Sequence, residues 1–141
     1  MVLELLWLPA IDEMLSRLGV EYIDLLLLHQ PFGDILGAWK DMEKAVEMGK
    51  IRSIGISNFE DYNFDRLIEN AKILPAVHQT ECHPYRQMKE MRARMDVYGI
   101  KQMCWYPLGG RGEGGTRDLL QYLAASIPRI LLKILVHRIL N

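Results

Sequence analysis

The chain has 141 residues, of which 50% are hydrophobic and 25% charged, and its formal net charge is −1. This length and composition are typical of a soluble globular domain with a real core. The nearly balanced charge gives no general attraction for nucleic acid, which we therefore do not expect as a partner.

Two kinds of hydrophobic pattern alternate along the chain from Ile11 onward. Hydrophobic residues at helical spacing predict four helices, at about residues 11–18, 36–46, 64–71 and 88–98. Asp12 and Glu13 are expected in the first turn of the first helix. Short apolar runs between the helices predict four strands, at about residues 23–28, 51–56, 75–80 and 100–105. The third strand is expected to begin at Pro75, where a missing N–H does least harm.

The first apolar run reads "LLLLHQP" over residues 25–31. It is too short for a membrane-spanning helix, which needs about 20 residues, so we expect no membrane span. Its length suits a strand that is buried on both faces, and Pro31 should end that strand near Gln30. His29 is therefore predicted at the carboxyl end of a buried parallel strand, where barrel enzymes carry their catalytic groups.

The order of helix and strand, repeated four times, requires parallel strands joined by helical crossovers. A doubly wound sheet and a barrel both satisfy this order. The expected strand ends lie roughly 25 residues apart, which suits a (β/α) barrel; they are His29, Ser57, Thr80 and Trp105. No Gly-x-Gly-x-x-Gly follows any strand, which weakens the dinucleotide-binding alternative. We therefore predict an α/β chain that forms a partial (β/α)8 TIM barrel of about four β/α units.

Polar and aromatic residues gather where the predicted strands end. They are His29, Ser57, Asn58, Gln79, Glu81, Trp105 and Tyr106. Each has an ordinary structural explanation when taken alone, since Ser-Asn after a strand is typical of a turn. On a barrel the set would converge on one mouth and form a ligand site. The glycine-rich segment at residues 107–115 predicts a long loop.

Four motifs together resemble the aldo-keto reductase family: "LLLLHQP", "GKIRSIGISNF", "PAVHQTECHPY" and "CWYPLGG". The resemblance covers about residues 11–112, and "HQPFGD" is similar to the microbial, NADPH-dependent branch that reduces small aldehydes, ketones and keto-sugars. It implies a (β/α) barrel that binds NADPH and reduces the carbonyl of a small aldehyde or ketone to an alcohol.

The resemblance also implies roles for individual residues. His29 matches the histidine that orients the substrate carbonyl, and it is the expected catalytic residue. Ser57, Asn58 and Gln79 match the residues that hold the nicotinamide carboxamide, whose acceptor and donors a hydroxyl and two amides can satisfy. Trp105 stands where the family has an aromatic ring that stacks on the nicotinamide. The loop under the pyrophosphate is matched by Tyr106, Pro107, Leu108, Gly109 and Gly110, where glycine permits close backbone approach.

The sequence also departs from the family. The family's catalytic aspartate, tyrosine and lysine precede the segment that begins at Ile11, and the residues present there match none of them. The segment that clamps the adenosine 2′-phosphate is not matched either, and His78 stands where the family usually has asparagine. We expect one domain over residues 1–141, a partial aldo-keto reductase barrel truncated at both ends, which alone is largely inactive.

The end of the chain does not resemble the family. Residues 119–141 contain no Asp or Glu, and Arg129, Lys133 and His137 recur every four residues among hydrophobic ones. This atypical tail fits a cationic amphipathic helix, or a barrel helix without its partners.

Two other functions remain open from the sequence. The first is a non-catalytic nucleotide-binding or regulatory half-barrel. The second is a metal-dependent hydrolase barrel that uses His78, Cys82 and His83, but neighbouring residues of an extended segment point in opposite directions, so we expect no metal site. Open strand edges predict possible self-association. Two cysteines without a Cys-x-x-Cys motif favour a reduced, cytoplasmic protein.

Overall fold

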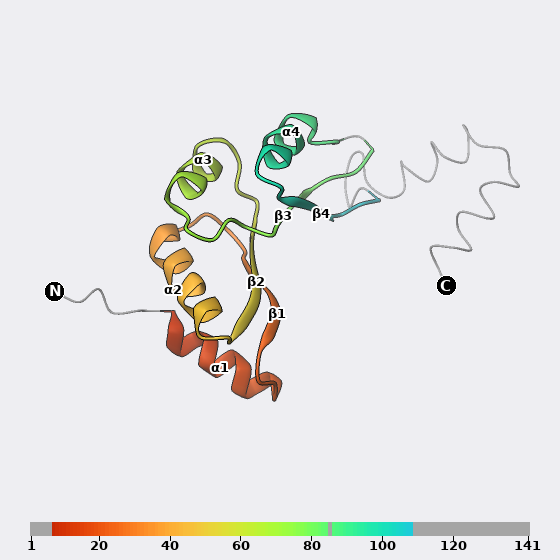
Figure 1. Cartoon of the computed structure of the whole chain (residues 1–141). Coiled ribbons are helices and arrows are strands. Elements are labelled where there is room, and N and C mark those ends of the chain that lie inside the picture. The colour runs from red at the N-terminus through yellow and green to blue at the C-terminus, as the bar shows by residue number, and fades with distance from the viewer. Residues whose placement is uncertain (1–6, 85, 109–141) are drawn as a thin grey trace, which may run out of the picture. The chain divides into compact units, whose positions relative to one another are not determined.

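The computed structural model describes residues 7–84 and 86–108. These residues belong to two units, one formed by residues 7–80 and 89–103 and the other by residues 81–88 and those from 104 onward. Helices and strands alternate through the described residues (Figure 1). The elements are α1 Leu8–Leu18, β1 Ile23–Leu28, α2 Ile35–Glu47, β2 Ile51–Ser57, α3 Asp61–Asn70, β3 Val77–Glu81, α4 Lys89–Val97 and β4 Lys101–Trp105.

The strands form one sheet in the order β1-β2-β3-β4. The β1–β2 pair is parallel, with Ile23 beside Ile51 and Leu28 beside Ile56. The β2–β3 pair is also parallel, and Ser57 lies beside Gln79. Sequential parallel strands that are joined by helices confirm the predicted partial barrel of about four β/α units.

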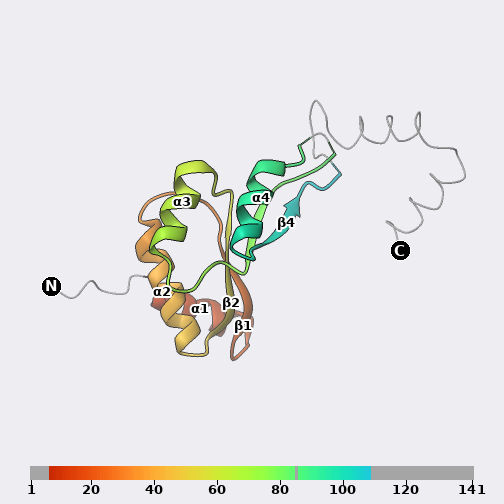
Figure 2. The same cartoon turned by 45° about the horizontal axis from the view of Figure 1, so that its top comes forward.

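Helices cover one face of this sheet. Figures 1 and 2 show α2 and α3 on the same side of β1 and β2. The core on that side is fully buried and is built by Trp39 of α2, Ile54 and Ile56 of β2, and Phe64 and Leu67 of α3. Alternation along the strands turns the neighbouring residues to the opposite face.

Gly55 lies on that opposite face, between β1 and β3. It pairs with Leu27 on one side and with Val77 on the other. A Cβ at Gly55 would lie 2.7 Å from the Leu27 and Val77 side chains, which is inside van der Waals contact. Glycine at this position therefore lets the two larger side chains approach each other across β2.

Three details of the sequence prediction are wrong. The first helix begins at Leu8 with Pro9 in its first turn, so Asp12 and Glu13 lie further along it. Strand β3 begins at Val77 rather than Pro75, because Pro75 has no N–H to contribute to a ladder. Helix α3 begins at Asp61, three residues before its predicted start, and the other predicted boundaries differ from the structure by at most one residue, which is ordinary for helix and strand ends.

The third wrong detail is the burial of β1, which was expected on both faces. Leu25, Leu27 and Leu28 are only half-buried. The reason is that β1 lies at an edge of the described sheet and pairs only with β2.

Among residues 7–84 and 86–108, no helix has both the length and the hydropathy needed to cross a bilayer. The predicted tail at residues 119–141, together with Gly109 and Gly110, lies outside the described residues.

Candidate cofactor and carbonyl site

The carboxyl ends of the first three strands bring the predicted residues of the first unit to one end of the sheet. Leu28 pairs with Ile56, so His29 follows beside Ser57. Ser57 itself pairs with Gln79. The prediction that His29 and Gln79 lie at the same end of the sheet is therefore confirmed.

Asn58 joins these three strand ends. Its backbone N–H donates to the Gln79 carbonyl at 2.9 Å. Its side-chain Nδ2 donates to the Ser57 hydroxyl at 3.2 Å and lies 3.4 Å from the His29 carbonyl oxygen. One residue thus connects β1, β2 and β3 at the point where the strands end.

The backbone of Asn58 has an uncommon conformation. Its φ is +60°, in the left-handed region that most side chains avoid. Asparagine is one of the few residues that adopts this region readily, because its short polar side chain can hydrogen-bond locally. This turn directs the chain from β2 into α3 and leaves the Asn58 amide at the rim of the sheet.

His78 lies beneath this turn and is fully buried. Its Nε2 accepts a hydrogen bond from the Phe59 backbone N–H at 3.1 Å. Its ring stacks on Phe64, with centroids 5.7 Å apart and an interplanar angle of 21°. Burial lowers the pKa of His78 to about 4, because desolvation disfavours the charged imidazolium. The imidazole is therefore neutral at physiological pH.

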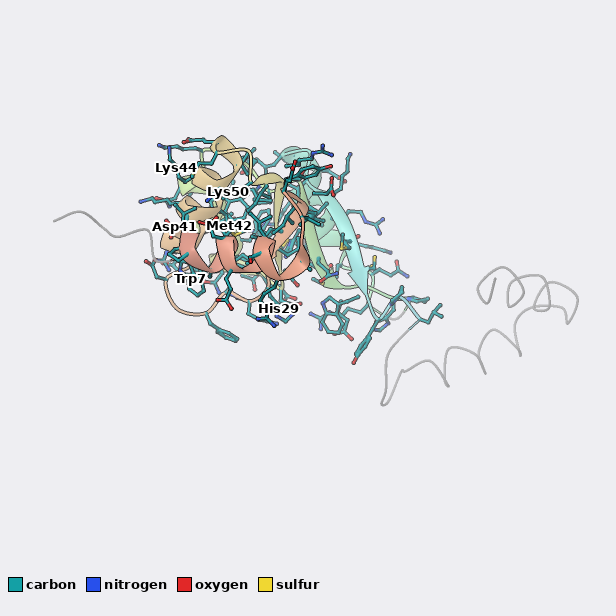
Figure 3. All side chains as sticks on the ribbon, turned by 90° about the horizontal axis from the view of Figure 1, so that it is seen from below. Trp7, His29, Asp41, Met42, Lys44 and Lys50 are labelled. Carbon is teal, nitrogen blue, oxygen red and sulfur yellow. The ribbon has the colours of Figure 1, made fainter. Side chains whose placement is uncertain are left out.

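The side chains of Gln79 and His29 differ in their surroundings. Gln79 is half-buried, and its Nε2 lies 3.1 Å from the Met103 sulfur of β4. The His29 side chain is exposed, and Figure 3 shows it well apart from Lys44 and Lys50. An exposed imidazole at a strand end is accessible to a ligand.

The second unit contains the predicted aromatic residues. Trp105 ends β4 and is half-buried, and its ring meets that of Tyr106 edge to face, with centroids 5.0 Å apart. Tyr106 has a positive φ of 50°. Pro107 and Leu108 follow and are exposed.

Sequence reasoning missed several buried polar residues. Asp41 and Glu43 of α2 are almost fully buried. The Asp41 carboxylate accepts a hydrogen bond from the Trp7 backbone N–H at 2.7 Å. Figure 3 shows these two residues side by side. Glu43 Oε1 accepts the backbone N–H groups of Lys72 and Ile73 at 2.7 and 2.8 Å. The available signal was spacing, since Glu43 lies four residues after Trp39 and therefore on the same helix face.

The metal alternative finds no support in the geometry of His78. Its Nε2 is occupied by the Phe59 N–H. Cys82 Sγ lies 3.8 Å from the Gln87 carbonyl oxygen, and His83 Nε2 lies 3.4 Å from Glu81. Within the described part of the chain, no three His, Cys, Asp or Glu residues are grouped so that they could hold a metal ion.

Comparison with known proteins agrees with the geometry. The profile of the Aldo/keto reductase family matches residues 7–118. Morphine 6-dehydrogenase of Pseudomonas putida is 41% identical over 114 residues, which are 79% of this chain and 38% of that protein. 2,5-Diketo-D-gluconic acid reductase B of Corynebacterium sp. is 44% identical over 113 residues, which are 78% of this chain and 41% of that protein.

A solved structure shows the same fold. The aldo-keto reductase of Bombyx mori in complex with NADP superimposes with a TM-score of 0.69 at 35% identity, over 77% of this chain and 38% of that one. The chain thus spans about 40% of the length of the curated relatives that it matches. A family profile that covers most of the chain, together with these identities and this fold, leads to one conclusion: the chain belongs to the aldo/keto reductase family.

Proposed function

We propose that this chain supplies the carbonyl-orienting and nicotinamide-holding part of an NADP(H)-dependent oxidoreductase, which reduces aldehyde or ketone carbonyls to alcohols. One observation carries the proposal: Asn58 links the ends of three neighbouring strands, where His29, Ser57 and Gln79 lie together. Membership of the aldo/keto reductase family supports the reaction class, and the Bombyx mori relative was solved with NADP.

His29 is the proposed catalytic residue. Its exposed imidazole would donate an N–H to the substrate carbonyl oxygen and stabilise the negative charge that develops there. NADPH, when bound, would supply the hydride. The contact between Asn58 Nδ2 and the His29 carbonyl oxygen would hold His29 in place beside the residues that bind the cofactor.

The proposed cofactor residues fit a carboxamide. Such a group presents one acceptor and two N–H donors, and the ends of β2 and β3 carry a hydroxyl on the fully buried Ser57 and two amides on the half-buried Asn58 and Gln79. We further propose that Trp105 stacks on the nicotinamide and that Tyr106, Pro107, Leu108, Gly109 and Gly110 run under the pyrophosphate. The family resemblance of this segment supports those roles.

We also propose that the 141-residue chain by itself turns over little substrate. None of its residues matches the family's proton-donating tyrosine, and loss of a general acid typically lowers a rate by about 10²–10⁴. The alternative is a non-catalytic nucleotide-binding half-barrel. We propose a small carbonyl compound as the substrate and, because the sequence has only two cysteines and no Cys-x-x-Cys motif, a reduced cytoplasmic setting.

Titration of the chain with NADPH, followed by cofactor fluorescence, tests the proposed site. Asn58→Gly keeps the positive φ but removes the amide, and Gln79→Leu removes the second amide. Each variant should weaken binding about tenfold, the effect of one lost hydrogen bond of about 1.4 kcal/mol. Asn70→Ser, which removes an exposed amide at the end of α3, should bind like the wild type.

NADPH oxidation with a reactive aldehyde tests the proposed inactivity, and we expect no measurable rate. Binding that neither Asn58→Gly nor Gln79→Leu affects would refute the cofactor roles. Robust turnover by the unaltered chain would refute the proposed need for the missing acid.

A further inference from the structure

Within residues 7–84 and 86–108, His78 is the fully buried histidine, and its contacts lead directly to the proposed cofactor residues. It lies one position before Gln79 in β3, on the opposite face of the strand. Its Nε2 accepts the backbone N–H of Phe59, the residue that follows Asn58. A single hydrogen bond therefore connects the helix-covered core to the turn that carries the Asn58 amide.

The hydrogen bond fixes one particular peptide. The Phe59 N–H belongs to the peptide plane between Asn58 and Phe59, and its direction determines the ψ angle of Asn58. The other neighbouring contact, from the Asn58 N–H to the Gln79 carbonyl, fixes the preceding peptide plane. Held on both sides, Asn58 stays in its left-handed conformation, with Nδ2 close to the Ser57 hydroxyl and to the His29 carbonyl oxygen.

The imidazole is well suited to hold this peptide. It is fully buried and stacked on Phe64, so its ring has little freedom to turn. An accepting Nε2 requires the proton on Nδ1, and Nδ1 has no hydrogen-bond partner among the described residues. Among the described residues the buried ring therefore makes one hydrogen bond, and that bond is with the turn at Asn58.

We infer that His78 is a positioning residue for the cofactor site, because its neutral imidazole holds the Asn58–Phe59 peptide and thereby sets the place of the Asn58 amide. The expected effect on cofactor binding rests on the proposed function, because a displaced Asn58 amide matters only if that amide binds the nicotinamide carboxamide. His78 itself is fully buried, so its role does not include contact with substrate or cofactor.

Two measurements on the full chain test the inference. The first is the exchange rate of the Phe59 backbone amide, read by mass spectrometry with fragmentation at low micromolar concentration. The second is the NADPH dissociation constant. His78→Leu fills a similar volume without an acceptor, whereas the shorter side chain of His78→Asn keeps an acceptor oxygen. Thr80→Val is the matched control, because Thr80 is buried on the same face of β3 but its hydroxyl contacts Gln102.

In His78→Leu we expect the Phe59 amide to exchange at least tenfold faster and NADPH to bind at least tenfold more weakly. His78→Asn should restore both values towards those of the wild type, and Thr80→Val should change neither. If His78 were only structural, His78→Leu would lower the melting temperature without selectively releasing the Phe59 amide and weakening NADPH binding. His78→Asn would then not restore these two values. Where His78→Leu does not melt cooperatively, His78→Met takes its place, since a flexible side chain adapts to the same volume.

Two results would overturn the inference. One is a Phe59 amide as protected in the variant as in the wild type. The other is a released Phe59 amide with unchanged NADPH affinity. Absence of NADPH binding by every protein, the wild type included, would instead refute the proposed cofactor site, and the exchange rates would still decide whether His78 holds the turn.

Discussion

At the scale of single residues, His78 makes the stability of the protein depend on pH. Its folded-state pKa of about 4 lies below the ordinary value of 6.5. Between these two pH values the unfolded chain binds a proton that the folded chain does not. The contribution of His78 to stability is therefore complete above pH 6.5 and is lost as the pH falls towards 4, by at most about 1.4 kcal/mol per pH unit.

Urea unfolding at about pH 7.5, 6 and 5 measures this dependence. As the pH is lowered, the free energy of unfolding should decrease more steeply for the wild type than for His78→Asn, which has no titrating ring at this position. Equal slopes for the two proteins would show that His78 does not remain neutral on folding.

The residue scale also shows what the sequence could and could not predict. His29, Ser57 and Gln79 were placed at one end of the sheet from strand ends alone, because parallel strands share their polarity. The hydrogen bonds of His78 and Glu43 could not be predicted in this way. They join residues 19 and about 30 positions apart, and local patterns do not specify such contacts.

At the scale of elements, Gly55 controls how closely β1 and β3 pack against β2. Gly55→Ala should lower the free energy of unfolding by about 1–3 kcal/mol, because the new Cβ would overlap Leu27 and Val77. Ser53→Ala is the control, since Ser53 lies two residues earlier on the same face and is half-buried. It should change the value by less than about 0.5 kcal/mol. Equal effects of the two substitutions in chemical denaturation would contradict the close packing at Gly55.

Helix α2 holds the segment between α3 and β3 through Glu43. Removal of this carboxylate in Glu43→Ala leaves the N–H groups of Lys72 and Ile73 without their acceptor. We expect a loss of roughly 1.5–3 kcal/mol, as for hydrogen bonds to a charged group. Glu47→Ala, which removes an exposed ion pair with Lys44, should cost less than about 1 kcal/mol. A thermal melt that ranks the two variants in the reverse order would refute the role of Glu43.

The fold was more predictable at this scale than the packing. Alternating periodicities were enough to predict eight elements and their order. The burial of β1 was predicted wrongly because a run of leucines indicates an apolar strand but not how many neighbours that strand has.

At the scale of the whole molecule, the described sheet leaves β1 paired on one side only. Its leucines are half-buried, and unpaired strand edges favour association. We expect the chain to self-associate at tens of micromolar, which light scattering after sizing chromatography would detect. Leu25→Lys on β1 should reduce the associated fraction, whereas Met48→Lys, at an exposed position after α2, should not. A monomeric wild type at that concentration would contradict the prediction.

Whether this chain carries the carbonyl-orienting and nicotinamide-holding part of a reductase, as we propose, can be decided by grafting it into a whole relative. Residues 7–118 would replace the matching segment of the Corynebacterium 2,5-diketo-D-gluconic acid reductase B, which is 44% identical over 113 residues. NADPH oxidation with a reactive aldehyde would then be measured. We expect turnover by the graft, and His29→Ala should lower its kcat at least about 10²-fold while leaving NADPH affinity unchanged. A cooperatively folded graft without turnover would refute the proposed function, and a kcat that His29→Ala leaves unchanged would refute the catalytic role of His29.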